Sequence, residues 1–173
     1  MAKELKKTTA ANNGVTISKD NMAPFQAAIK KLTQRICLVG ITSDTAPREE
    51  GTDITNAVIG YISEFGSPAN NIPARPFLIP GVNNVKDQIA SRLKVAGQKA
   101  LDGNIAEIDR QLTACGLLAV TSVQQKITEG PFQPLAPSTL AARRARGVTR
   151  TQPLIDTGVL WQSITFVLRD RDA

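Results

Sequence analysis

The sequence predicts an α+β fold in which a small antiparallel sheet is packed by helices. Two short β-forming segments, 36–41 and 164–168, lie near opposite ends of the chain and are expected to pair. Between them, apolar residues recur at helical spacing over long stretches. Of the 173 residues, 42% are hydrophobic and 21% are charged, which is typical of a globular chain with one core.

Helices are expected wherever apolar residues recur every three or four positions between recognisable end signals. Thr55 is placed to cap one helix and Gly66 to end it, while Ser138 is placed to cap another. The expected helices are 23–32, 56–65, 84–101, 105–128 and 139–146.

The two longest of these helices are separated only by Asp102-Gly103-Asn104. A break of three residues between amphipathic helices predicts a long antiparallel helical hairpin over about 84–128. Before it, the segment 67–80 contains four prolines. Proline lacks an amide hydrogen and disfavours helix in the residue before it, so an extended and stiff segment is expected there.

The first 21 residues are polar and are expected to form a flexible arm, with residues 22–173 as a single α+β domain. No apolar region follows the N-terminal lysines, and no apolar run approaches the length of a membrane helix. The expectation is therefore a protein made in a cytoplasm, without a membrane partner.

Histidine is absent, and Cys37 and Cys115 are the only cysteines. Both lie among apolar neighbours, so buried reduced thiols are expected and structural zinc is set aside. Without histidine, the commonest general base is missing. No catalytic, cofactor-binding or metal-binding residue is predicted, and a non-enzymatic protein is favoured.

Asp156-Thr157-Gly158 matches the active-site tripeptide of aspartic peptidases, in which two carboxylates activate water. Only 15 residues follow Gly158, too few for the sheet that such a fold places after its catalytic aspartate. The favoured interpretation is that Asp156 caps a helical turn over 157–162.

Four arginines, Arg143, Arg144, Arg146 and Arg150, form a cluster with no acidic residue among them. In a chain of net charge +6, such a cluster can meet phosphates, or it can be a solvated face that docks on an acidic protein. The segment has no aromatic residue for stacking on bases, which favours the second interpretation.

Two single residues also stand out. Glu64 ends a predicted helix, where a carboxylate opposes the helix dipole, so a basic partner is expected and Arg75 is the candidate. Trp161 is the only tryptophan. Core packing is its favoured role, and a subunit contact is the alternative.

Three short motifs occur along the chain in a particular order. The first is Tyr-Ile-Ser-Glu-Phe-Gly at 61–66, followed by Ile-Pro-Ala-Arg-Pro-Phe-Leu at 72–78. The second is Leu-Ala-Pro-Ser-Thr-Leu at 135–140, and the third is Pro-Leu-Ile-Asp-Thr-Gly at 153–158. In this order and spacing the three segments resemble the neck, tail-completion and virion-morphogenesis proteins of tailed bacteriophages. The resemblance covers about 36–168. Ser63 stands where such proteins often have histidine, and 43–53 follows no recognised pattern.

The resemblance implies a structural role late in assembly, in an oligomeric ring at the head-proximal end of the tail. A hexamer is expected because a ring must match the six-fold symmetry of its neighbour. The implied partners are other neck, connector and tail proteins, and genomic DNA passing without sequence-specific contacts. A tail terminator, a head-closure ring and a basic nucleic-acid-binding protein remain alternatives. The candidate interface or structural residues are Glu64, Phe65, Gly66, Pro73, Arg75, Pro76, Phe77, Asp156, Thr157, Gly158 and Trp161, with the four arginines as a docking patch.

Overall fold

The computed structural model describes residues 22–42 and 54–171, and within these ranges the fold is seven α-helices with one two-stranded antiparallel sheet. The predicted arm at 1–21 and residues 43–53 lie outside the described residues. In chain order the elements are α1 (Met22–Gln34), β1 (Arg35–Ile41), α2 (Asn56–Phe65), the 3₁₀ turn η1 (Pro68–Asn70), α3 (Leu78–Asn84), α4 (Lys86–Leu101), α5 (Ile105–Glu129), α6 (Pro137–Ala145), α7 (Val159–Gln162) and β2 (Ile164–Asp170).

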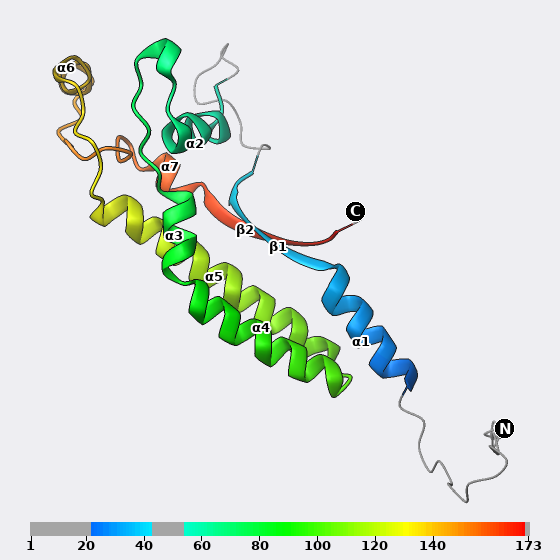
Figure 1. The fold of residues 1–173 in the computed structure, drawn as a ribbon. Helices are drawn as coiled ribbons and strands as arrows, with labels where there is room; N and C mark the ends of the chain where they lie inside the picture. The colour runs from blue at the N-terminus through cyan, green and yellow to red at the C-terminus, as the bar shows by residue number, and fades with distance from the viewer. Residues whose placement is uncertain (1–21, 43–53, 172–173) are drawn as a thin grey trace, which may run out of the picture.

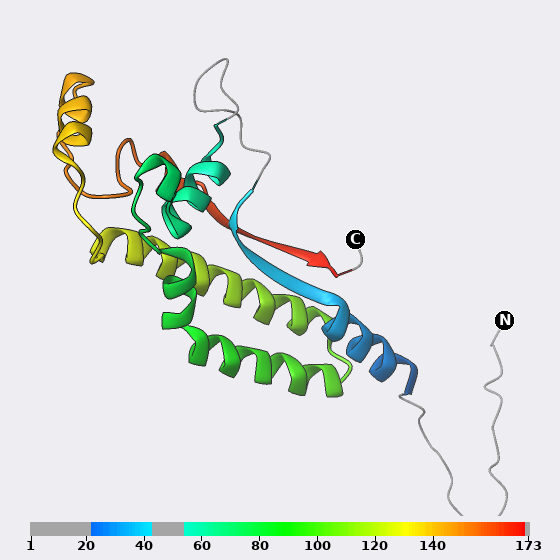
Figure 2. The same cartoon turned by 45° about the horizontal axis from the view of Figure 1, so that its top comes forward.

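The long helix α5 organises the fold. Figures 1 and 2 show α4 running alongside α5, with the β1–β2 ribbon along another side of α5. Helix α1 packs near the turn between α4 and α5, whereas α2, α6 and α7 gather near the other end of α5 (Figure 1). That second end holds the segments on which the phage resemblance was based.

The sheet pairs the two segments predicted to be strands, and this prediction is confirmed. Ile41 lies opposite Ile164 and Arg35 opposite Asp170, so both strands are slightly longer than expected. Side chains alternate across a sheet, so only one face of each strand packs on α5. On the other face Leu38 pairs with Val167, and each is 43% exposed.

The core forms two clusters along α5. The first joins α1, α4 and α5, around Ala28, Ala100, Ile108 and Leu112. The second joins α3, α5 and β2, around Phe77, Val123, Ile127 and Ile164. The partly buried Leu154 and Ile155 pack against this second cluster, which therefore anchors the third resemblance segment.

The proline-rich segment and the helix after it differ from expectation. Pro68–Asn70 forms a 3₁₀ turn, and helix α3 already begins at Leu78, so 67–80 is not extended throughout. Pro80 lies in the first turn of α3, where no helical amide is required of it. Val85 then separates α3 from α4, whereas one helix was expected to run from 84.

Helices α3 and α5 cross closely at Gly81. A Cβ atom at this position would lie 2.7 Å from the Cα atom of Val123, and the Ser122 hydroxyl donates to the Gly81 carbonyl oxygen at 2.6 Å. Gly97 in α4, by contrast, has no neighbouring atom within 4 Å of such a Cβ. A methyl group at position 81 would therefore clash with α5, whereas one at position 97 would meet no neighbouring atom.

We expect Gly81→Ala to lower the free energy of unfolding by about 2–3 kcal/mol, because backbone atoms of α5 would have to move. Gly97→Ala is the matched control and is expected to raise it by about 0.5–1 kcal/mol through helix propensity. Urea unfolding followed by circular dichroism measures both. Equal effects of the two substitutions would contradict the close crossing.

Candidate functional site

Glu64, at the end of α2, caps helix α3. Its Oε2 atom accepts hydrogen bonds from the amides of Phe77 at 2.7 Å and Leu78 at 2.8 Å, and Oε1 accepts from the amide of Ile79 at 3.0 Å. Glu64 is 5% exposed. The prediction that Arg75 is the basic partner of Glu64 is therefore wrong. Glu64 instead binds the N-terminus of α3, which is the positive end of the helix dipole and whose amides lack acceptors within their own helix.

The chain between Glu64 and α3 folds back on itself at Gly66. Gly66 has a φ of 76°, and a Cβ atom there would lie 2.8 Å from the Ala74 nitrogen, so this turn requires glycine. Ser67 and Ile72 exchange two backbone hydrogen bonds, of 2.8 and 3.0 Å. The two parts of the first resemblance segment are thereby held against each other.

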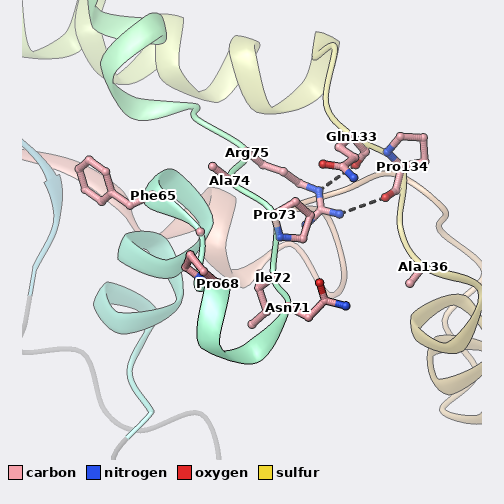
Figure 3. A pocket seen from close by; sticks show the side chains of 11 residues that line it. Phe65, Pro68, Asn71, Ile72, Pro73, Ala74, Arg75, Gln133, Pro134 and Ala136 are labelled. Atoms are coloured by element: carbon pink, nitrogen blue, oxygen red, sulfur yellow. Dashed lines mark hydrogen bonds between the residues drawn. The ribbon is translucent and has the colours of Figure 1, made fainter.

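Arg75 joins this turn to the segment that follows α5. Its Nε atom donates to the Gln133 carbonyl oxygen at 2.8 Å, and Nη2 donates to that of Pro134 at 3.0 Å. Figure 3 shows the side chain reaching across a cavity of about 590 Å³ to these two carbonyls. Burial lowers the pKa of Arg75, and the positive charge of Arg143 lowers it further. Arg75 thus connects the first resemblance segment to the two residues that precede the second.

The cavity at Arg75 is mainly lined by the turn and by the irregular segment after it. Its walls are Phe65, Gly66, Pro68, Asn71, Ile72, Pro73, Ala74, Arg75, Gln133, Pro134 and Ala136. Of the neighbouring predicted residues, Pro76 is exposed and Phe77 is in the core, with 1% exposure. Some of the motif residues, such as Phe77, are therefore part of the core, whereas others, such as Pro73 and Arg75, line this cavity.

Arg143, in α6, holds the third resemblance segment. Its Nη1 atom donates to three carbonyl oxygens, those of Arg150 at 3.0 Å, Gln152 at 2.8 Å and Ile155 at 3.1 Å. With 6% exposure, Arg143 is not part of a docking patch, which corrects the prediction for this residue. Between the bonded carbonyls, Leu154 has a φ of 65°, a conformation that residues with a Cβ atom rarely adopt.

Asp156 is bound by two arginines. Its Oδ2 atom lies 3.0 Å from Nη2 of Arg146, and its Oδ1 atom lies 3.7 Å from Nε of Arg143. The prediction that Asp156 caps a helical turn is wrong, because α7 begins at Val159 after Gly158, which has a φ of 89° and makes no side-chain cap. The Asp-Thr-Gly tripeptide therefore lies at the end of a loop that Arg143 and Arg146 bind through Asp156.

Trp161 lies at the surface rather than in the core. Its Nε1 atom donates to the Gln124 carbonyl oxygen at 3.1 Å, and the Gln124 side chain donates to the Trp161 carbonyl oxygen at 3.2 Å. It is 36% exposed and, with Thr157, lines a shallow hollow of about 340 Å³. The core-packing interpretation is therefore wrong, and a contact role for the ring stays a prediction.

Helix α2 and the residue before it present large apolar side chains to solvent. Tyr61 is 66% exposed, Phe65 57% and Val58 42%, and Ile54 just before the helix is 51% exposed. The rings of Tyr61 and Phe65 contact each other with centroids 4.9 Å apart, and Phe65 points away from Arg75 (Figure 3). A cluster of exposed aromatic and aliphatic side chains on one helix is typical of a protein contact surface. We call these four residues the α2 surface.

The other three predicted arginines are exposed. Arg146 pairs with Asp156, and Arg144 donates to the Leu140 carbonyl oxygen of its own helix at 3.3 Å. Arg144 and Arg150 lie on the same hollow of about 230 Å³, whose other walls are Leu140, Val148, Thr149 and Thr151. We call this hollow the α6 pocket.

Nothing in the described residues gathers three or more potential metal ligands among His, Cys, Asp and Glu. Cys37 and Cys115 are both free, and burial raises the pKa of each thiol, so neither is activated as a thiolate at neutral pH. None of the helices in 22–42 and 54–171 combines the length and apolar composition that crossing a bilayer requires.

Comparison of the chain with protein-family models, with curated proteins and with solved structures finds no match.

Proposed function

We propose that this protein is a structural component of a tailed-phage virion, which forms a ring at the head-proximal end of the tail and joins the tail to the head side. The observation that supports this proposal best is the meeting of the resemblance segments at one end of α5. Glu64, Arg75 and Arg143 join them through hydrogen bonds to backbone atoms. In this proposal the residues of the resemblance segments maintain the shape of the subunit and do not catalyse a reaction.

The α2 surface supplies the contact face in this proposal. Its four large apolar side chains are exposed, Phe65 among them lines the Arg75 cavity, and Trp161 is exposed on the neighbouring α7. A monomer gains nothing by leaving such a group in water, whereas a ring buries it against the next subunit. The α4–α5 pair then acts as a helical hairpin that stiffens the subunit, and 71–77 acts as a stiff connecting segment.

A basic nucleic-acid-binding protein is the second candidate. It is favoured by the exposure of Arg144, Arg146 and Arg150 in a stretch, 130–155, that has no acidic residue. Such a protein would bind duplex DNA with an affinity that falls steeply as salt rises. The assembly protein needs little affinity for free DNA.

The proposal predicts a position in the particle. Electron microscopy of virions labelled with an antibody against this chain should show label at the junction of head and tail. Label along the tail shaft, at the distal tip or on the capsid surface would contradict the neck position, and absence of the chain from purified virions would exclude a virion protein. Preimmune serum is the control.

A further inference from the structure

The α6 pocket combines two exposed arginines with an apolar floor. Arg144 and Arg150 line it together with Leu140 and Val148, and the hydroxyl-bearing Thr149 and Thr151 complete it. No ion pair is recorded for either guanidinium in the described residues, although the neighbouring Arg143 and Arg146 share Asp156. The pocket is therefore a positively charged hollow at the surface.

The chemistry of the pocket favours a carboxylate on a side chain. Guanidinium groups bind carboxylates with good geometry, and Arg146 already does so with Asp156 at 3.0 Å. Leu140 and Val148 offer contact to the methylene groups of an entering acidic side chain. The hollow has a volume of about 230 Å³, and each of its two guanidinium groups can meet one carboxylate.

The chain itself contains the complementary charge. Residues 43–53 include four carboxylates and one arginine, a net charge of −3 within eleven residues. Residues 130–155 include four arginines and no carboxylate. In a ring built head to tail, every interface joins two different surfaces of the subunit, so a basic hollow of one copy can face an acidic segment of the next. Complementary charges of this kind fix orientation and suppress wrong pairings.

We propose that the α6 pocket of one copy binds the acidic segment 43–53 of the adjacent copy, with Glu49 and Glu50 as the carboxylates that meet Arg144 and Arg150. This inference rests on the proposed ring. It adds that the contact has a direction, because the pocket and its anion come from different parts of the chain. A contact of exposed charges also weakens as salt rises.

Charge exchange in the full-length protein tests the inference. Sedimentation velocity over a concentration series gives the self-association constant of the wild type, of Arg144→Glu/Arg150→Glu, of Glu49→Arg/Glu50→Arg and of the fourfold variant. Each double variant is expected to associate about tenfold more weakly or worse, because like charges then face each other. The fourfold variant restores opposite charges and is expected to return close to the wild-type constant.

Lys86→Glu/Lys94→Glu is the matched control, since it changes the net charge as much as the arginine variant does, at exposed positions on α4. It should associate like the wild type, and unchanged thermal unfolding shows that each variant folds.

The inference is overturned if the wild type stays monomeric at its highest soluble concentration, or if the fourfold variant does not regain the wild-type association constant. If the wild type self-associates and none of the charge variants changes the association constant, the pocket assignment is overturned but the ring proposal stands. Loss of duplex-DNA binding by the arginine variant, with association unchanged, assigns the pocket to DNA instead.

Discussion

Replacing Glu64 with alanine is expected to lower the free energy of unfolding by about 3–5 kcal/mol. The substitution removes a buried carboxylate that accepts hydrogen bonds from the amides of Phe77, Leu78 and Ile79, so three amides at the start of α3 lose their acceptor. Hydrogen bonds to charged groups are stronger than neutral ones, and unsatisfied buried groups are costly. The same change also separates α2 from α3, which disturbs the α2 surface.

Glu64→Gln refines this prediction. The remaining amide oxygen can still accept from Phe77 and Leu78, but the new NH₂ group would face the Ile79 amide, a donor against a donor. We expect a loss of about 2 kcal/mol. Glu129→Ala is the control, because Glu129 also ends a helix but is exposed, and it should change stability by less than about 0.5 kcal/mol. Urea unfolding measures the free energy of unfolding of each variant. A Glu64→Gln variant as stable as the wild type would contradict the capping role.

Replacing Arg143 with alanine is expected to cost about 3–4 kcal/mol. The carbonyl oxygens of Arg150, Gln152 and Ile155 would lose their common donor, and Asp156 would keep only Arg146. Arg144→Ala, one residue along α6, is the matched control and is expected within about 0.5 kcal/mol of the wild type, because its side chain is exposed.

Hydrogen exchange localises the Arg143 effect. In Arg143→Ala, amides of 147–158 should exchange faster than in the wild type, while those of the α4–α5 pair should change much less. Equal stability loss in the Arg143 and Arg144 variants would mean that the buried guanidinium does not hold the loop. Loss of protection over the whole chain would mean that the loop is part of the global core rather than a local closure.

The parts of the fold that depend on local signals could be predicted from the sequence. Helix α2 has the predicted bounds because Thr55 and Gly66 supply a cap and a terminator beside the helix itself. The strands were also found, since short β-branched runs bounded by polar residues are local patterns. Helix α3 was missed, because the group that caps it is Glu64, 13 residues upstream, beyond the reach of any periodicity argument.

The candidate site was harder to predict, because its side chains act across the fold. Arg143 and Arg144 are adjacent and chemically identical, yet one binds three carbonyls and the other is exposed. Composition cannot distinguish them. Tyr61 and Phe65 follow the spacing of a core face, but α2 packs on its neighbours through a different side, on which Gly60 and Glu64 are buried. The burial of Glu64, which marks that side, is visible only in the structure, where the carboxylate accepts three amide hydrogen bonds.

The measurement that tests the joining role most directly is negative-stain electron microscopy of particles made when the gene for this chain is disabled. If this chain joins the tail to the head, filled heads should accumulate apart from finished-looking tails, and mixing extracts should show which half lacks the protein. A complementing copy of the gene should restore joined particles. Normal, infectious virions without this chain would contradict the account and would direct attention to DNA binding through Arg144, Arg146 and Arg150.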